Sequence, residues 1–414
     1  MLLARLLKKL VQIGHLTVID ADGKSHLFAG QDGPTLTIRL HDRALHWKLF
    51  VRPELYAGEA FMDGTLTVED ASIYDFLDLI GRNIDAARRD PLDGPARWLD
   101  SAFRRIQQYN PAVRAHRNVA HHYDLSGALY RLFLDNDMQY SCAYFLSPDD
   151  GIDQAQAQKR RHIAAKLLLE PGMSVLDIGS GWGGLGLYLA GRTGAQVTGI
   201  TLSREQLAVA QTRAKEAGLD ERTTFALRDY RDQDGTFDRI VSVGMFEHVG
   251  INHYDRFFAL LRDRLADDGV ALLHTIGRVE MPGSTNPWLR KYIFPGGYSP
   301  ALSEVMAAVE RAGLWVTDIE VLRLHYASTL SQWRTRFLDN RAAAAELYDE
   351  RFCRMWEFYL AASEVSFRYL RSAVFQIQLA RRQEAVPLTR DYITAAERRL
   401  AQADEAPQRE ERAA

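Results

Sequence analysis

The stretch that decides the fold is Val175-Leu176-Asp177-Ile178-Gly179-Ser180-Gly181-Trp182-Gly183-Gly184. An apolar run ends in an acid, a glycine-rich turn follows, and residues 185–190 are compatible with a helix. Glycine has no Cβ and tolerates positive φ, so such a turn lets a ligand approach the backbone closely. The stretch therefore predicts a strand, a turn and a helix, with a ligand site at the turn.

The spacing of the glycines indicates the kind of ligand. Asp177 and the three glycines at 179, 181 and 183 follow the pattern Asp-x-Gly-x-Gly-x-Gly, which differs from the dinucleotide pattern Gly-x-Gly-x-x-Gly. It resembles the nucleoside-binding loop of S-adenosylmethionine-dependent methyltransferases. The resemblance implies that Gly179, Gly181 and Gly183 wrap the methionine and ribose of the cofactor, and that Asp177 orients the loop or meets the ammonium group. The alternative is a tight structural turn that binds nothing.

Strands and helices alternate after residue 173. The expected strands are 174–178, 196–200, 224–227, 237–243, 269–276, 314–319 and 321–325, with helices such as 205–217 and 253–266 between them. Regular alternation predicts an α/β fold with a doubly wound, mainly parallel sheet. The resemblance of the glycine turn implies that this sheet is of the class I, Rossmann-like methyltransferase type. Ligands in such sheets bind at the carboxyl ends of the strands, near the point where the strand order reverses.

The N-terminal part has a different pattern. Period-two segments at 16–19 and 36–40 precede helical periodicity over 73–87. Residues 1–95 are therefore predicted to form a small α+β domain of a size that folds alone. This part of the chain also resembles the lipid-binding domain of bacterial enzymes that act on phospholipids. A linker helix is expected at 96–117, the methyltransferase domain at 118–395, and a disordered tail at 396–414, where large apolar residues are few.

Composition narrows the function classes. The net charge of −3 over 414 residues argues against a nucleic-acid binder. The two cysteines, Cys142 and Cys353, have no metal-ligand spacing, so no metal is expected and a reducing cytoplasm fits best. No apolar run is long enough to span a bilayer. The amphipathic segment 2–13 either lies on a membrane surface or docks on its own domain, and the second interpretation is favoured.

Further cofactor residues are expected after the second and third strands. Nucleoside sites often place a carboxylate at the end of the second strand, where this chain has Thr201. Gln206 is a candidate ribose partner, or part of a capping box with Ser203. Asp229 is a candidate acceptor for the adenine amino group, or a helix cap. The expected set beyond the glycine turn is Thr201, Leu202, Gln206, Asp229 and Tyr230.

Five motifs in one order identify a family. They are Tyr123-Asp-Leu-Ser126, Met138-Gln-Tyr-Ser-Cys-Ala-Tyr-Phe145, Gly199-Ile-Thr-Leu-Ser203, Met245-Phe-Glu-His-Val-Gly250 and Tyr292-Ile-Phe-Pro-Gly-Gly297. Together they resemble the cyclopropane fatty acid synthase family, which includes the mycolic acid cyclopropane synthases, over residues 118–392. The resemblance implies methyl transfer from S-adenosylmethionine to a cis carbon–carbon double bond. Loss of a proton from the new methyl group of the resulting carbocation then closes a three-membered ring.

The resemblance also implies a base pocket. Family members hold bicarbonate as the base, and the residues here that match its pocket are Cys142, Glu247, His274, Ile276 and Tyr326. It implies that Glu247 accepts a hydrogen bond from the bicarbonate hydroxyl, that His274 and Tyr326 donate, and that Cys142 and Ile276 act through backbone N–H groups. Tyr140 and Ser141 match residues at the carboxylate end of the cofactor. Each has a structural alternative, such as a buried thiol at Cys142 or a core histidine at His274.

Three functional hypotheses remain open. The first is a cyclopropane-fatty-acyl-phospholipid synthase that acts as a homodimer on unsaturated phospholipid chains, from the cytoplasmic side of the inner membrane. The second is a methyltransferase of the same fold that makes methyl-branched or methylene acyl chains, or methylates the nitrogen of a small molecule. The third is a non-catalytic lipid carrier or regulatory relative, which would be expected to lack the glycine turn or Glu247.

Overall fold

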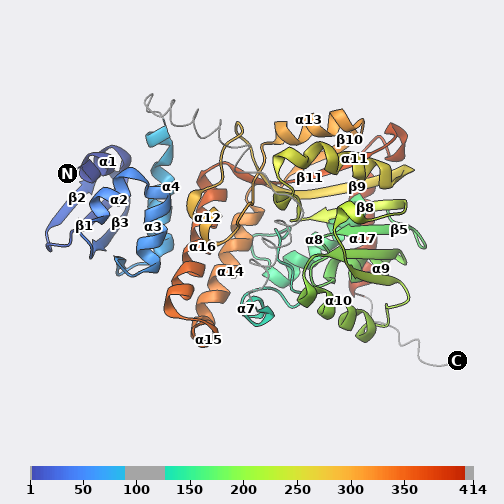
Figure 1. The fold of residues 1–414 in the computed structure, drawn as a ribbon, viewed down its shortest axis with the longest axis horizontal. Coiled ribbons are helices and arrows are strands. Elements are labelled where there is room, and N and C mark those ends of the chain that lie inside the picture. Colours follow the sequence, from blue (N-terminus) through green and yellow to red (C-terminus); the bar gives the residue numbers. More distant parts are fainter. Residues whose placement is uncertain (1, 89–125, 406–414) are drawn as a thin grey trace. The chain divides into compact units, whose positions relative to one another are not determined.

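The computed structural model describes residues 2–88 and 126–405 (Figure 1). They form two compact units that are each discontinuous in sequence. The first comprises the described residues up to 134 together with 277–302 and 323–373, and the second comprises the other described residues. The expected linker helix at 96–117 and the motif that begins at Tyr123 lie outside the described residues, apart from Ser126. The domain boundaries at 95 and 117 therefore remain a prediction.

The first unit begins with a four-stranded sheet in the order β2-β1-β3-β4. Strands β1 and β3 are parallel, whereas β2 and β4 pair antiparallel with them. Their period-two pattern buries one face of the sheet, which includes Leu16, Val18 and Ile38. The elements of this part are α1 (Leu2–Leu10), β1 (Ile13–Ile19), β2 (Ser25–Ala29), β3 (Gln31–Leu40), α2 (Leu45–Val51), α3 (Pro53–Met62), β4 (Leu66–Glu69) and α4 (Ile73–Arg88).

Helix α1 docks on its own domain. Leu3, Leu7 and Leu10 are buried, and the helix packs against α2 and α4, while Lys8 and Lys9 face solvent. The second interpretation of the N-terminal segment is therefore correct for these leucines, because the apolar stripe is already covered by protein.

The first unit also contains helices from late in the chain. Helix α16 packs along α14 and against α3 and α4, and the Tyr369 hydroxyl on α16 donates to Asp78 on α4 at 2.7 Å. The buried carboxylate of Glu364 accepts hydrogen bonds from Arg334 and Arg368. The helices of the first unit that follow α4 are α7 (Gly127–Arg131), α12 (Pro287–Tyr292), α14 (His325–Asp339), α15 (Arg341–Leu347) and α16 (Glu350–Tyr369).

A seven-stranded sheet in the order β10-β11-β9-β8-β5-β6-β7 organises the second unit. The run from β9 to β7 is parallel, and β10 pairs antiparallel with β11. The strands are β5 (Ser174–Ile178), β6 (Gln196–Thr201), β7 (Thr223–Leu227), β8 (Phe237–Val243), β9 (Leu265–Arg278), β10 (Trp315–Val321) and β11 (Ser372–Ala380). The strand order reverses between β5 and β8, which puts the expected ligand position at the carboxyl ends of these two strands.

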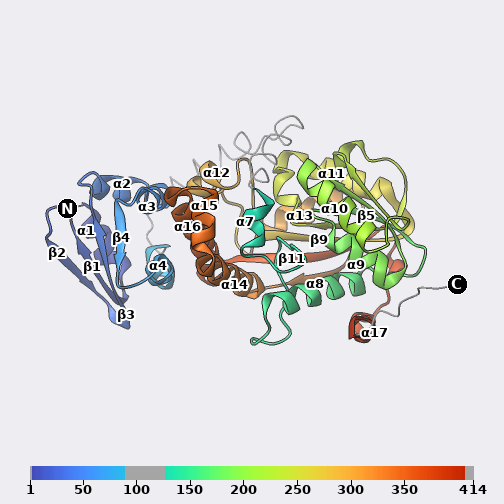
Figure 2. The ribbon, with the colours of Figure 1, turned by 90° about the horizontal axis from the view of Figure 1, so that it is seen from below.

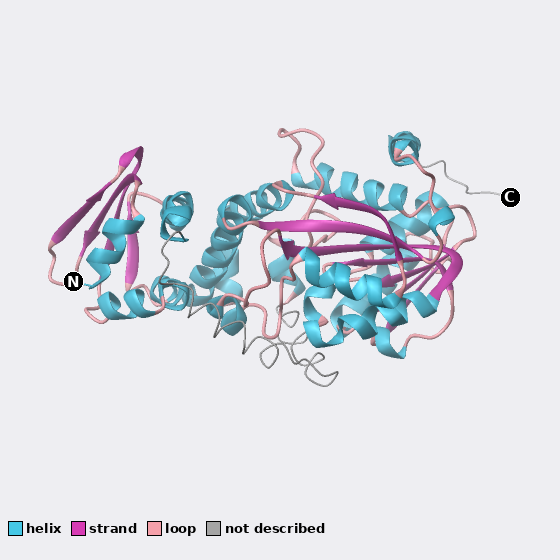
Figure 3. Ribbon diagram, turned by 90° about the horizontal axis from the view of Figure 1, so that it is seen from above, coloured by secondary structure: helices cyan, strands magenta, loops and turns pink. Residues whose placement is uncertain are grey.

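Helices cover both faces of this sheet (Figures 2 and 3). Figure 2 shows α8 and α17 on one side of β9 and β11, with α11 and α13 on the other. The core on the α8 side joins Ile163 and Leu167 to Leu189, Val175 and Val241. The helices are α8 (Ile152–Lys166), α9 (Gly184–Thr193), α10 (Arg204–Glu216), η2 (Tyr230–Asp232), η3 (Phe246–His248), η4 (Ile251–His253), α11 (Tyr254–Arg264), α13 (Leu302–Ala312), η5 (Gln383–Ala385) and α17 (Asp391–Glu405).

Two sequence predictions are wrong. No strand forms over 321–325, because β10 ends at Val321 and α14 begins at His325. The tail is helical as far as Glu405 rather than disordered from 396, because α17 packs on α8 and its Leu400 contacts the core. Among the described helices, none combines the length and the apolar character that crossing a bilayer requires.

Candidate functional site

The glycine turn has the backbone that its sequence predicts. Gly179, Gly181 and Gly183 have φ values of 89°, 54° and 85°, a region that residues with a Cβ rarely adopt. A Cβ at Gly179 would lie 2.9 Å from Met245 Cβ, and one at Gly183 would lie 2.9 Å from Ala210 Cβ. Nothing lies within 4 Å of the Cβ position at Gly181. Gly181 is therefore the point where a ligand can approach the backbone without displacing protein atoms.

Asp177 lies at the end of β5, immediately before this turn. It is almost fully buried, and its Oδ2 atom has no hydrogen-bond partner among the described residues. Burial raises the pKa of Asp177 to about 7, against the opposing charge of Lys159. A buried carboxyl group without a partner is costly, so this oxygen is suited to a ligand that carries a donor or a positive charge.

Thr201 and Gln206 bond to each other at the end of β6. The Thr201 hydroxyl donates to Gln206 Oε1 at 2.9 Å, and both residues are buried. Ser203 caps α10 by accepting the Gln206 backbone N–H at 3.3 Å, so half of the expected capping box is present. The Gln206 side chain faces Thr201 instead of returning to Ser203. Leu202 lies between the strand and the helix and is partly buried.

Asp229 is used within the protein at the end of β7. Its side chain caps the short helix η2 by accepting the Arg231 backbone N–H, and it also holds the Arg231 guanidinium in a bidentate contact. The cap interpretation is thus confirmed, while the adenine contact stays a prediction. Tyr230 packs edge-on against Phe257 with ring centroids 5.4 Å apart, and burial raises its pKa to about 12.

Glu247 follows β8 on the short helix η3. Its Oε1 atom accepts the backbone N–H of Ile276 on β9 at 2.5 Å, which joins two of the predicted residues directly. Its Oε2 atom is buried and has no hydrogen-bond partner within the described parts of the chain. Burial raises the pKa of Glu247 to about 7, although the Ile276 hydrogen bond opposes this change. The Ile276 N–H that was expected to face an anion thus donates to Glu247 in this structure.

His274 lies on β9, two residues before Ile276, and is opposite Val243 in the register of β8. It is 2% exposed, and its Nδ1 atom is 3.2 Å from the amide nitrogen of Gln376 on β11. Its Nε2 atom has no partner within residues 2–88 and 126–405. Burial holds the pKa of His274 well below its usual value, with further lowering by the charges of Lys159 and Lys166. The ring is therefore neutral near pH 7.

Ser141 and Cys142 lie in the loop before α8. Cys142 is buried, and its thiol donates to the Ala143 carbonyl at 3.3 Å. The Ser141 hydroxyl accepts a hydrogen bond from Lys159 Nζ at 2.8 Å. Lys159 is completely buried on α8, and burial lowers its pKa to about 8. Tyr140, the preceding residue, is partly buried.

The structure brings most of the predicted residues to one edge of the sheet, but not all of them belong to the same unit. Residues from Tyr140 to Ile276 lie in the second unit, at or near the carboxyl ends of β5, β6, β7, β8 and β9. Tyr326 lies on α14 in the first unit, buried between Trp333 and Phe367. Its place beside Glu247 and His274 stays a prediction.

The sequence patterns did not predict the buried polar side chains of α8 and β11. Lys159, His162 and Lys166 on α8 are all buried, at a spacing that puts them on one helix face. Gln376 and Gln378 on β11 are also buried, and they contact Lys166 or its backbone carbonyl. A charged helix face normally predicts exposure, so only a search for His and Lys at helical spacing would have singled out α8.

This geometry suits chemistry on a charged or polar ligand in a dry site. The carboxyl edge offers two carboxyl groups with raised pKa values, a neutral imidazole and a backbone turn open at Gly181. Among the described residues, no group of three or more His, Cys, Asp or Glu side chains is placed to hold a metal ion.

The fold and the glycine turn define the class of protein: a class I S-adenosylmethionine-dependent methyltransferase fold with a small N-terminal β-sheet domain. A solved structure of the mycolic acid cyclopropane synthase CmaA1, complexed with SAH and CTAB, matches with a TM-score of 0.61 and 34% identity. The match covers 66% of this chain and 99% of that one. The chain belongs to the mycolic acid cyclopropane synthetase family, whose model matches residues 111–377. The resemblance identified from the five motifs is thereby confirmed.

Two relatives differ in their named products. The cyclopropane-fatty-acyl-phospholipid synthase of Escherichia coli strain K12 is 44% identical over 260 residues, which are 63% of this chain and 66% of that protein. The tuberculostearic acid methyltransferase UfaA1 of Mycobacterium tuberculosis strain H37Rv is 35% identical over 393 residues, 91% of this chain and 90% of that protein. The match to the Escherichia coli protein thus spans slightly less than two thirds of its length.

Proposed function

We propose that this chain transfers the methyl group of S-adenosylmethionine to a cis double bond in an unsaturated phospholipid acyl chain, and that the product is a cyclopropane ring. Bicarbonate, held in the pocket around Glu247 and His274, is the proposed base. The proposal rests on family membership together with one observation: Glu247 Oε2 and His274 Nε2 are buried polar atoms without partners among the described residues. Buried polar groups are normally paired, so these two atoms fit a small polar ligand.

The residues of the chain have distinct proposed roles. Gly179, Gly181 and Gly183 let the cofactor lie against the backbone, and Asp177 Oδ2 accepts from its ammonium group. Tyr140 and Ser141 meet its carboxylate end, and Lys159 holds the Ser141 oxygen so that the hydroxyl hydrogen points away from the lysine. Thr201, Leu202, Gln206, Asp229 and Tyr230 line the nucleoside end.

A second group of residues would serve the base. Glu247 accepts from the bicarbonate hydroxyl through Oε2, and His274 donates through Nε2. Tyr326 and the backbone N–H of Cys142 are further proposed members of the pocket, and the Ile276 N–H serves it by holding Glu247 Oε1. The burial of the site supports this arrangement, because charge interactions with a developing cation are stronger where water is excluded.

A branched acyl product is the second candidate. The relative UfaA1, which covers 91% of this chain, is named a tuberculostearic acid methyltransferase, whereas the Escherichia coli relative is named a cyclopropane synthase. Both reactions would begin with methyl transfer to an alkene. An amine-methylating enzyme is less favoured, because a lone pair on nitrogen needs no carbocation stabilisation and no carbon-bound proton to be removed.

Action at a membrane surface is part of the proposal. Helix α2 exposes Trp47, Phe50 and Val51 beside Lys48, and Trp47 is 63% exposed. Aromatic and apolar residues with a nearby lysine are typical of a surface that lies in the interface of an anionic bilayer. We propose peripheral association with the cytoplasmic face of the inner membrane and action as a homodimer. Two weak membrane contacts in a dimer would bind more tightly than one.

The test incubates purified protein with S-adenosylmethionine, bicarbonate and vesicles of unsaturated phospholipid. The proposal expects acyl chains enlarged by one CH2 group and upfield cyclopropane protons in the NMR spectrum. Olefinic methylene or methyl-doublet signals would instead indicate the branched product. Failure to modify any acyl chain, with the cofactor bound, would leave a methyltransferase fold with another target. Sedimentation of the protein with vesicles and analytical ultracentrifugation test the membrane contact and the dimer.

A further inference from the structure

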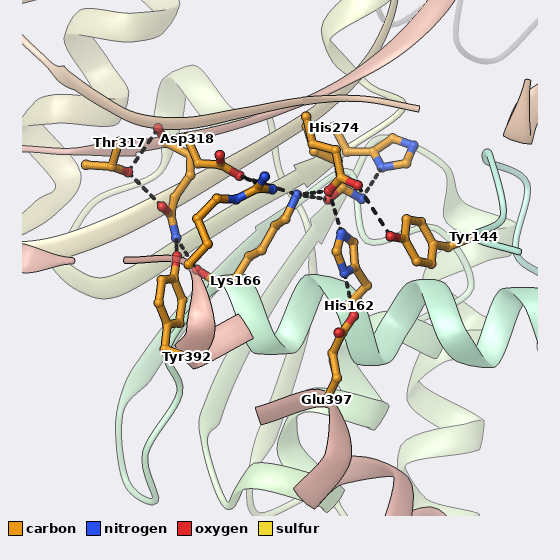
Figure 4. Close-up of polar contacts among 12 residues, drawn as sticks. Tyr144, His162, Lys166, His274, Thr317, Asp318, Tyr392 and Glu397 are labelled. Atoms are coloured by element: carbon orange, nitrogen blue, oxygen red, sulfur yellow. Dashed lines mark hydrogen bonds and ion pairs between the residues drawn. The ribbon is translucent and has the colours of Figure 1, made fainter. Parts of the chain in front are cut away.

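A chain of buried polar contacts leads from α8 to His274 (Figure 4). Lys166 Nζ contacts Glu320 on β10 and donates to Gln376 Oε1 on β11 at 2.9 Å. The amide nitrogen of the same Gln376 lies 3.2 Å from His274 Nδ1. All these residues belong to the second unit.

The charged end of this series of contacts, the pair Lys166 and Glu320, is held in place by further hydrogen bonds. Glu320 Oε2 also accepts from His162 Nε2 at 2.7 Å, and His162 Nδ1 lies 2.6 Å from Glu397 on α17. Figure 4 shows His162 between Glu397 and the lysine contacts. Burial alone would raise the pKa of Glu320, but the hydrogen bonds and charges of His162 and Lys166 hold that pKa below its usual value. Glu320 therefore stays ionised, and the ammonium group of Lys166 has an anion beside it.

This anchoring decides which way the Gln376 amide points. A lysine ammonium group donates hydrogen bonds and accepts none, so the oxygen of Gln376 must face Lys166. The NH2 group of the same amide then faces His274. The reversed amide would place its NH2 group against the ammonium hydrogens, leaving both without an acceptor in a buried place.

The amide orientation in turn decides the tautomer of the imidazole. An NH2 group can bond to Nδ1 only if Nδ1 carries no hydrogen, and a neutral imidazole then carries its hydrogen on Nε2. Nε2 is the atom without a partner among the described residues. We propose that Gln376 is a positioning residue: with Lys166 it holds His274 as the Nε2–H tautomer, so that His274 faces its ligand as a donor.

The proposal builds on the proposed function, in which His274 donates to an anion. The Nδ1–H tautomer would present a lone pair at Nε2 and would repel that anion. Because the tautomer is fixed before the ligand binds, no free energy is needed during the reaction to move the hydrogen from Nδ1 to Nε2. The buried contacts from Glu320 through Lys166 to Gln376 thus hold the neutral His274 in the tautomer that donates a hydrogen bond from Nε2.

Gln378 provides a matched control. It is buried on the same face of β11, two residues after Gln376, and is also an amide. Its NH2 group donates to the Lys166 carbonyl and to the Tyr392 hydroxyl, and its Oε1 atom accepts from Thr317 at 2.8 Å. No contact joins it to His274 within the described residues. Replacing Gln378 therefore has the stability cost of removing a buried amide but leaves the tautomer of His274 unchanged.

The test reads the tautomer directly. The full chain is labelled with 15N-histidine, and the imidazole nitrogens are observed by long-range proton–nitrogen NMR without cofactor or lipid. A His274→Asn variant identifies the His274 signals. The proposal expects hydrogen on Nε2 and a bare Nδ1 at neutral pH. In Gln376→Glu the carboxylate accepts instead of donating, so Nδ1 should gain a hydrogen, whereas Gln378→Leu should leave the His274 signals as in the wild type.

Turnover supplies the second readout. Residues that orient a ligand through another side chain typically change activity by about 10-fold to 100-fold, so Gln376→Glu should lower kcat by that amount with cofactor affinity unchanged. A wild-type spectrum with hydrogen on Nδ1, or a Gln376→Glu spectrum identical to that of the wild type, would overturn the proposal. Because the spectrum is recorded without substrate, it tests the tautomer even if the chain proves to methylate another molecule. If Gln376→Glu does not fold, the wild-type spectrum alone decides.

Discussion

Glu247 and Ile276 join two strands of the site, with the Ile276 backbone N–H donating to Glu247 Oε1 at 2.5 Å. One oxygen of the carboxylate is thereby held by the fold, while the other, Oε2, is buried without a partner among the described residues. A purely structural glutamate would have both oxygens satisfied or would lie at the surface. The proposed function places a ligand at Oε2, and this asymmetry underlies the first two predictions.

Replacing Glu247 by glutamine should impair catalysis much more than cofactor binding. The amide oxygen can still accept from Ile276, but an NH2 group would replace the acceptor at Oε2. Loss of one preorganised polar contact in an active site typically costs about 100-fold to 1,000-fold in kcat. Single-turnover assays give the chemical step, and calorimetry with S-adenosylmethionine gives affinity. Wild-type turnover in this variant would remove Glu247 from the base pocket.

The same variant should gain stability at high pH. The pKa of Glu247 is raised from 4.5 to about 7 by burial, so the folded state holds the proton more tightly than the unfolded state. Ionisation therefore destabilises the fold progressively as pH rises from 4.5 to 7, by up to about 3 kcal/mol above that range. Chemical denaturation should show Glu247→Gln more stable than the wild type at pH 8 and nearly equal to it at pH 4.5. Equal stability at both pH values would contradict the buried, unpartnered carboxylate.

Replacing Gly181 by alanine should weaken cofactor binding, whereas its effect on stability should be that of an alanine at any comparable positive-φ position. Gly218 is its matched control, because both have positive φ, 54° and 63°, and neither Cβ position has an atom within 4 Å. An alanine at either position costs about 1 kcal/mol of backbone strain. Thermal denaturation should show similar losses for Gly181→Ala and Gly218→Ala, whereas calorimetry should show weaker cofactor binding for Gly181→Ala alone. Equal cofactor affinity in the two variants would exclude the turn as the cofactor site.

Helix α17 should contribute to stability, although the sequence predicted disorder from residue 396 onward. Leu400 contacts the core formed by α8 and α9, and Asp404 pairs with Arg161 and Arg192. Leu400→Ala should lower the free energy of unfolding by about 1–2 kcal/mol, since the side chain is only partly buried. Leu388 is fully exposed, so Leu388→Ala should leave stability unchanged in the same urea titration. Two indistinguishable unfolding curves would mean that α17 is not docked in solution.

The glycine turn and the parallel strands were predictable because they depend on local patterns. Asp177 and the three glycines signal a strand and a positive-φ turn within a few residues, and the structure has both. Short apolar runs likewise predicted β5 to β9. These features need little information from distant parts of the chain.

The series of polar contacts that orients His274 was not predictable from local patterns. Helix α8 buries Lys159, His162 and Lys166 together with apolar residues such as Ile163, so its sequence does not separate into the apolar and polar faces by which a packed helix is normally detected. Strand β11 has the alternating run Phe375–Leu379, which would predict that its glutamines are exposed, but the strand is buried on both faces and the partners of the glutamines lie far away in sequence. Buried polar residues are stable only with such partners, and partners appear only in the folded structure.

The most direct test of the account follows the hydrogens of the transferred methyl group. The protein is given S-adenosylmethionine with a trideuteriomethyl group, bicarbonate and vesicles of unsaturated phospholipid, and the acyl products are analysed by mass spectrometry and NMR. Loss of one deuterium from the transferred carbon, within a cyclopropane ring, is the predicted result. A product that keeps all three deuterium atoms as a methyl branch, or an unlabelled acyl chain, would contradict it.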